Sequence, residues 1–177
     1  MRVLTWLRTS ALLATLATAL LCGSTRAQTR VDETLLHLSE TELQARLPEL
    51  RRAAKPVVGP RGLRGTWTAP GARLQGLALD TTFYLRAKSV QRIEQRWAST
   101  SARDCTPQLE QALAADLETR WGASVSTTED TGTPEWQRAT LWTQGDAEAR
   151  LLFSQTGGQC AVMLVYAPYL PKDAATL

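Results

Sequence analysis

Hydrophobic residues recur at helical spacing in the middle of the second half of the chain. Thr106 and Pro107 suit an N-cap and a first helical turn, and Gly122 suits a C-terminal cap. Between these signals an apolar residue returns every three or four positions, at Leu109, Leu113, Leu117 and Trp121. This pattern predicts an amphipathic helix that begins at residue 107 and ends near residue 121.

Three strand-like segments follow, at residues 136–143, 147–154 and 160–166. Polar, glycine-containing turns at 144–146 and 155–158 separate them, which favours antiparallel pairing. Residues 160–166 are almost wholly apolar, so we expect this segment to form a central strand that is buried on both faces.

The first half begins with a capping box, in which Ser39 and Glu42 can satisfy each other's backbone N–H groups. This predicts a helix that begins near residue 40. Pro48 disfavours helical geometry at Leu47, so we expect the helix to end or kink there and to continue for another turn or two through residue 54. Residues 56–65, rich in Pro and Gly, are interpreted as a linker.

Residues 63–68 have strand character, with a turn expected at 69–71. Residues 77–86 alternate between apolar and polar side chains, which predicts a half-buried strand. Residues 90–97 fit helical and strand spacing about equally well, and the short turn at 87–88 favours a strand.

The two halves therefore have the same predicted order, a helix followed by three strands, at about 38–97 and 105–168. We predict an α+β fold: a two-layer sandwich in which an antiparallel sheet is covered by helices, built from two α-β-β-β pseudo-repeats.

Residues 1–27 have the pattern of a secretory signal peptide. Arg2 and Arg8 precede an apolar stretch at 10–21, and small residues stand before a cleavage site near Ala27. A stretch of about a dozen apolar residues is too short to cross a bilayer, so no transmembrane segment is expected in the mature chain. We expect a periplasmic or secreted protein with one domain at 28–177; lipidation of Cys22 is less favoured, because Leu21 is bulky.

Removing the leader changes the charge of the protein. The chain has 20 basic and 17 acidic residues, and three of the basic residues lie in the leader. The mature chain is left with 17 of each sign and no net charge. No nucleic-acid or anionic-lipid partner is therefore expected, because phosphate binding needs an excess of positive charge.

Two cysteines remain after the leader, Cys105 and Cys160. A pair of cysteines in an exported protein is usually bridged, so we predict a structural disulfide. A redox-active pair more often shows the C-x-x-C spacing, which is absent here.

The order of elements resembles two known families. The capping-box segment 39–42 and the strand region 136–166 resemble parts of the beta-lactamase-inhibitory-protein fold and of the small outer-membrane assembly lipoproteins of the SmpA/OmlA type. The resemblance covers most of residues 38–168. It implies a scaffold that binds other proteins through its sheet face or loops and has no chemistry of its own.

No catalytic or metal-binding constellation is found in the sequence. Asp130 opens an Asp-Thr-Gly tripeptide, as in aspartic proteases, but it lies in a polar stretch, and its imagined partner Asp80 falls on the polar face of a strand. His37 is the only histidine and has no partner motif. We expect a protein that is not an enzyme and that needs no cofactor or metal.

Two segments are candidate binding surfaces. Arg61 and Arg64 lie in the glycine-rich segment 59–65 and could hold an anion, although a turn leading into a strand is the simpler interpretation. Trp136, Arg138 and Trp142 share one strand face and could form a docking patch for a protein, although packing in the core is the favoured interpretation. The sequence thus predicts an exported scaffold for a protein partner in the bacterial cell envelope, or a periplasmic carrier of a small apolar ligand or lipid.

Overall fold

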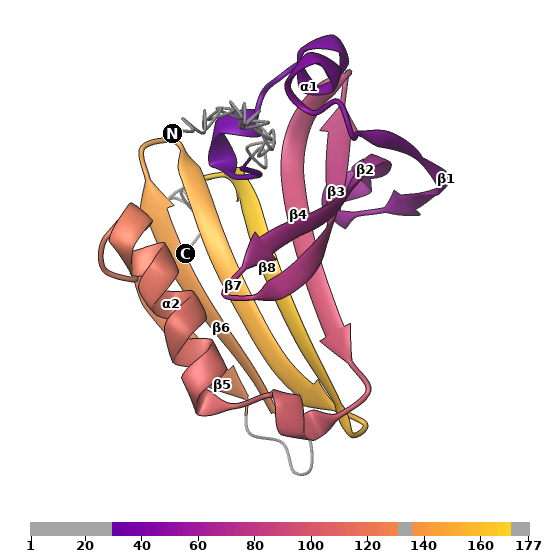
Figure 1. The fold of residues 1–177 in the computed structure, drawn as a ribbon. Coiled ribbons are helices and arrows are strands. Elements are labelled where there is room, and N and C mark those ends of the chain that lie inside the picture. Colours follow the sequence, from indigo (N-terminus) through magenta and orange to yellow (C-terminus); the bar gives the residue numbers. More distant parts are fainter. Residues whose placement is uncertain (1–29, 131–135, 171–177) are drawn as a thin grey trace, which may run out of the picture.

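The structure is a computed structural model that describes residues 30–130 and 136–170. Most of the described chain forms one antiparallel sheet of eight strands in the order β1-β2-β3-β4-β8-β7-β6-β5 (Figure 1). The strands are β1 (Arg51–Val58), β2 (Arg64–Leu74), β3 (Leu77–Arg86), β4 (Ser89–Ser99), β5 (Ser126–Asp130), β6 (Trp136–Gln144), β7 (Ala147–Thr156) and β8 (Gln159–Pro168). The helices are α1 (Glu40–Arg46), α2 (Pro107–Trp121) and the short 3-10 turns η1 (Glu33–Leu35), η2 (Pro60–Gly62) and η3 (Ala102–Asp104).

The last strand of each half lies in the middle of the sheet. β1 to β4 form one meander and β5 to β8 another, and each meander follows one α-helix. The halves join where β4 pairs antiparallel with β8, from Ile93 opposite Tyr166 to Ser99 opposite Cys160. Because no crossover separates the two meanders, they make one continuous sheet.

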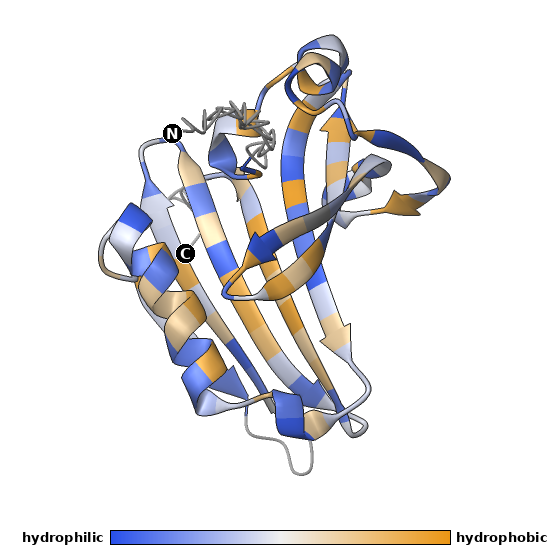
Figure 2. Ribbon diagram, in the orientation of Figure 1, coloured by the Kyte–Doolittle hydropathy of each residue, from blue (hydrophilic) through white to orange (hydrophobic). Residues whose placement is uncertain are grey.

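The core lies on one face of this sheet. Alternate residues of β7 and β8 are buried there, and the hydropathy of these strands changes accordingly along their length (Figure 2). Helix α2 covers the face with Leu113, Leu117 and Trp121. The β2–β3 hairpin and η1 also pack against this core, as Leu74, Leu77 and Leu35 show.

The predicted two-layer sandwich is wrong. Most of the described residues form one antiparallel sheet, and the two α-helices among them, of 7 and 15 residues, cover only part of it. Each half also has four strands where three were predicted. The missed strands, β1 and β5, are the edges of the sheet and are largely exposed on both faces, so no apolar alternation marks them in the sequence.

The first helix is shorter than predicted. The capping box is confirmed: the Ser39 backbone N–H donates to the Glu42 carboxylate at 2.8 Å, and the Ser39 hydroxyl accepts from the Glu42 N–H at 3.3 Å. The helix ends at Arg46, and the predicted continuation through residue 54 is wrong because β1 begins at Arg51. The predicted linker 56–65 contains the end of β1, η2 and the start of β2.

Two further boundaries differ from the prediction. The turn expected at 69–71 lies inside β2, where the register with β3 shifts between Ala69 and Ala72. Helix α2, its Thr106 cap, strands β3, β4 and β6 to β8, and the central place of β8 are confirmed. The predicted leader lies outside the described residues, and neither α-helix within them has the length and hydropathy of a membrane span.

Candidate functional site

The sheet has a second face, which neither α-helix covers among the described residues (Figure 1). Its side chains alternate with those of the core, so Ala161 and Met163 of β8 point away from α2 while Cys160 and Val162 point toward it. We call it the open face. Leu152, Ala161 and Met163 are half-buried there, an apolar surface that α2 does not shield.

A groove of about 500 Å³ crosses the open face. The strand register places its residues in two rows that run across five strands. One row is small or polar and consists of Ala98, Ala161, Ser154, Gln137 and Asp130. The next row is larger and consists of Arg96, Met163, Leu152, Ala139 and Thr128.

The shape of the groove follows from these side chains. Alanine and serine in the first row leave a depression beside the longer Leu152 and Met163 in the second. Neighbouring strands lie about 4.8 Å apart, so the four gaps between five strands give a length of roughly 19 Å. The arrangement can therefore hold an extended chain of five or six residues, each spanning about 3.3 Å.

A buried carboxylate stands beside the groove on the same face. Glu94 of β4 is almost fully buried, and its carboxylate accepts from Arg92 Nε at 2.6 Å, from Arg96 Nη2 at 2.6 Å and from the Tyr84 hydroxyl at 2.9 Å. Burial alone would raise the pKa of Glu94, but the hydrogen bonds from Arg92, Arg96 and Tyr84 outweigh it and hold the pKa below its usual value of 4.5. Burial, followed by the hydrogen bond to Glu94, raises the pKa of Tyr84 to about 12.

This cluster orients the basic end of the groove. The guanidinium of Arg96 is fixed on Glu94 by two of its nitrogens, yet 59% of the Arg96 side chain is exposed. Because Arg96 also belongs to the groove lining, the cluster presents a positioned positive charge to whatever occupies the groove.

In the glycine-rich segment 59–65 the structure shows the simpler interpretation, a short turn, η2, that leads into β2, and two of its glycines have a packing role. A Cβ at Gly59 would lie 2.6 Å from Cδ1 of Tyr84, and a Cβ at Gly65 would lie 2.7 Å from Cγ2 of Thr82. The two glycines thus make room for the Tyr84 ring. Arg61 and Arg64 are exposed and lie on η2 and at the start of β2. Trp136, Arg138 and Trp142 belong to β6, in the other half of the sheet.

Trp142 and Arg138 do not contribute to a docking patch, and the favoured interpretation, packing in the core, holds for Trp142. Trp142 is fully buried in the core, so its ring cannot meet a partner. Arg138 points to the helix side, where its guanidinium contacts Glu110 of α2 at 2.8 Å and Glu129 of β5 at 3.0 Å. The side chain of Trp136 lies outside the described part of the structure. Arg138 and Trp142 lie on the same face of β6, which is the face that α2 covers.

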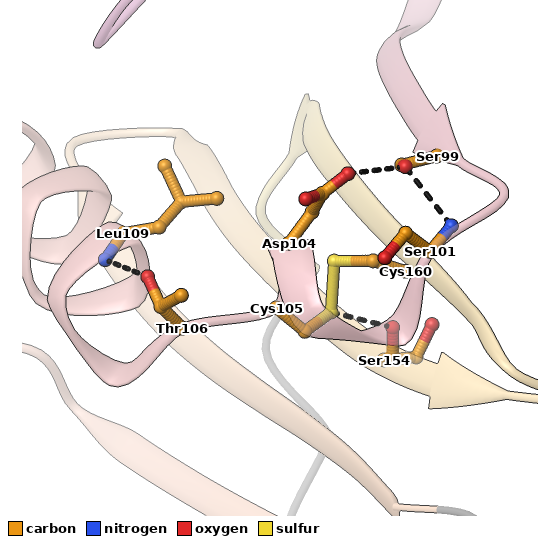
Figure 3. The surroundings of a disulfide bond; sticks show 8 residues. All are labelled: Ser99, Ser101, Asp104, Cys105, Thr106, Leu109, Ser154 and Cys160. Carbon is orange, nitrogen blue, oxygen red and sulfur yellow. Dashed lines mark hydrogen bonds between the residues drawn. A yellow bond between two sulfur atoms is a disulfide. The ribbon is translucent and has the colours of Figure 1, made fainter.

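The cysteine pair lies on the covered face of the sheet, next to the end of β7 (Figure 3). Cys105 and Cys160 are at disulfide distance, with an S–S separation of 2.07 Å and a Cα–Cα separation of 5.3 Å. The sulfur of Cys105 also lies 3.2 Å from the carbonyl oxygen of Ser154. Since Ala161 and Ser154 line the groove on the other face, the bond ties the start of α2 to the strands that carry the groove.

The end of β4 is held at the same place. The Ser99 hydroxyl contacts the Asp104 carboxylate and accepts from the Ser101 N–H at 3.1 Å (Figure 3). Thr106 caps α2 two residues later by accepting from the Leu109 N–H at 3.1 Å. Strands β4, β7 and β8 are thus all fastened to the segment that leads into α2.

The residues considered for catalysis are not brought together. Asp80 on β3 and Asp130 on β5 are separated by β4, β8, β7 and β6, a distance of roughly 24 Å at the usual strand spacing. His37 is exposed and precedes α1. Across residues 30–130 and 136–170, no three His, Cys, Asp or Glu side chains gather as a metal site would require.

A second cavity, of about 280 Å³, lies on the covered face between the β2–β3 hairpin and the end of α2. Arg120 lines it and donates to Asp116 at 2.7 Å and to the Tyr166 hydroxyl at 3.2 Å. Its guanidinium is therefore engaged within the chain, and we assign this cavity a structural role. Comparison of the sequence with protein-family models and with curated proteins gave no match.

The groove residues were missed at the level of sequence. Residues 160–166 were interpreted as buried on both faces, and Ala161 and Met163 are in fact half-buried lining residues. The alternation along β7 was a signal for the groove, because it placed Leu152 on the other face of the strand from the core residues Leu151 and Phe153.

Proposed function

We propose that this protein is an exported, non-enzymatic scaffold that holds an extended segment of a protein partner in the bacterial cell envelope. The observation that carries the proposal is the groove of about 500 Å³ across five strands of the open face. Its apolar row of Ala139, Leu152 and Met163 can bury side chains of the segment, and Arg96 at its end can meet a carboxylate or a backbone carbonyl. The cysteine pair suits an oxidising compartment outside the cytoplasm.

A small apolar ligand or lipid is the second candidate occupant. The volume of the groove falls within the range of roughly 300–1,000 Å³ that is typical of small-molecule sites. The groove is open along the sheet, however, and a site that buries most of a small ligand needs walls on more sides. This favours a chain segment over a carried ligand.

The test is photo-crosslinking in the native envelope, with the crosslinking residue at position 163 in the groove and, as a control, at position 118 on the exposed side of α2. We expect a protein adduct from position 163 only, and Leu152→Glu in the same chain should lower its yield at least tenfold. Small molecules released from the purified protein and lost in Leu152→Glu would instead identify a carrier. Equal adducts from both positions, or none, would contradict the proposal; circular dichroism verifies that each variant is folded.

A further inference from the structure

Positive charge is concentrated in one part of the molecule, although the predicted mature chain has no net charge. Residues 46–64, here named the basic lobe, contain six basic residues and one acidic residue, a net charge of +5. The rest of the mature chain therefore carries −5. All six basic residues are exposed: Arg46, Arg51, Arg52, Lys55, Arg61 and Arg64.

The basic lobe also exposes apolar side chains. Val57 is 48% exposed and Val58 is 80% exposed, values that are high for aliphatic residues in a strand. Val58 lies directly opposite Arg64 in the β1–β2 pairing, so a valine and a guanidinium are immediate neighbours. Figure 2 shows the change along β1, from hydrophilic residues after α1 to hydrophobic ones at its end.

Of the six basic side chains, Arg52 alone makes an ion pair within residues 30–130 and 136–170. Arg52 stacks on the Trp67 ring at 5.4 Å and lies 3.8 Å from Glu40. The side chains of Lys55, Arg61 and Arg64, in contrast, make no ion pair within the described residues.

The shape of the lobe selects among anionic partners. It projects from the edge of the sheet as β1 and the start of β2 (Figure 1). The pairing of β1 shifts register between Arg52 and Val57, and Pro56 has no N–H to donate, so this edge is a poor template for a partner strand.

We propose that the basic lobe docks the protein onto the surface of an anionic phospholipid bilayer. Lysine and arginine bind lipid phosphates, and Val57 and Val58 enter the boundary between headgroups and acyl chains, the usual arrangement of an interfacial anchor. The docking surface does not overlap the groove, so it is independent of the partner proposed above.

The experiment measures co-sedimentation of the oxidised protein, residues 28–177, with vesicles of phosphatidylcholine alone or of phosphatidylcholine with phosphatidylglycerol. We expect binding to the anionic vesicles only, weakened by added salt. Each basic residue near an anionic surface strengthens binding by roughly fivefold, so Lys55→Gln/Arg61→Gln/Arg64→Gln should lower the partition coefficient about a hundredfold. Val57→Ser/Val58→Ser should lower it roughly tenfold.

The matched control removes three exposed arginines elsewhere, as Arg73→Gln/Arg103→Gln/Arg150→Gln, and so changes the net charge equally. It should keep most of the binding. Absence of binding to anionic vesicles, equal binding to both vesicle types, or an equal loss in the control and lobe variants would overturn the proposal. Circular dichroism and the unfolding midpoint show that the variants are folded, and the crosslinking at position 163 is unaffected by any of these outcomes.

Discussion

The most consequential single residue of the open face is Glu94, a charged side chain that is only 3% exposed. A buried carboxylate is costly unless it is paired and hydrogen-bonded, and Glu94 has both kinds of compensation from Arg92, Arg96 and Tyr84. Because the same contacts fix Arg96 at the groove, the stability of the cluster and the geometry of the groove depend on one ionised group.

Replacing this group makes a prediction about pH. Glu94→Gln should lower the free energy of unfolding at pH 7 by about 2 to 3 kcal/mol, because it leaves two guanidinium groups without their countercharge. The folded-state pKa of Glu94 lies below its usual value, so its contribution is present above about pH 5 and is lost as the pH falls through the folded pKa. Urea unfolding across this range should therefore show the difference between wild type and Glu94→Gln shrinking on acidification.

The control for this prediction is Glu148→Gln, which breaks the more exposed pair with Arg150 on the same face. A pair of that kind contributes less than about 1 kcal/mol. Parallel pH profiles for wild type and Glu94→Gln would show that Glu94 is not the group that titrates.

At this scale the sequence could show which residues were unusual but not what they contact. The run of glycines at 59–65 was visible, and a turn leading into a strand was the simpler interpretation of it, with an anion loop as the alternative. Its cause is the ring of Tyr84, a strand further along the chain, which no local pattern connects to Gly59 and Gly65. Local pattern could likewise not connect Glu94 with Tyr84, because these two residues become neighbours only through the β3–β4 register.

At the scale of elements, α2 is the part that the sequence specified best. Its cap, apolar stripe and terminal glycine are all local signals, and all of them hold in the structure. The edge strands β1 and β5 were missed for the opposite reason. They are fixed by pairing with β2 and β6 and bury few side chains of their own, so tertiary pairing decides their conformation.

The attachment of α2 to the sheet gives a prediction about the disulfide. Cys105→Ser/Cys160→Ala should lower the free energy of unfolding by about 4 kcal/mol, the loop-closure value for a bridge across 55 residues. Amide hydrogen exchange should rise first in the opening turn of α2, which the bridge holds against β8. If the free energy of unfolding fell but the amides of α2 kept their protection from exchange, Thr106 and the apolar stripe would hold the helix in place without the disulfide.

At the scale of the whole molecule, the predicted layers are wrong, and so is the predicted repeat of one helix and three strands, because each half has four strands. The core is also closed by the β2–β3 hairpin, which packs against the covered face of the sheet. Net charge misled in the same way. Zero overall charge excludes an anionic partner only if the charges are evenly distributed, but residues 46–64 alone carry a net charge of +5, and their strand β1 lies at one edge of the sheet.

The joining of the halves at β4 and β8 makes the last prediction. One hydrophobic core contains Phe83 and Ile93 from the first half together with Leu117, Leu151 and Leu164 from the second. Leu164→Ala should therefore lower the free energy of unfolding by about 3 kcal/mol and lower the protection of the slowest-exchanging amides in β3 as much as in β7. Unfolding curves from tryptophan fluorescence and far-ultraviolet circular dichroism should coincide, as in a cooperative transition. If the β3 amides kept their wild-type protection in Leu164→Ala, the two meanders would be separate folding units that merely share a strand pairing.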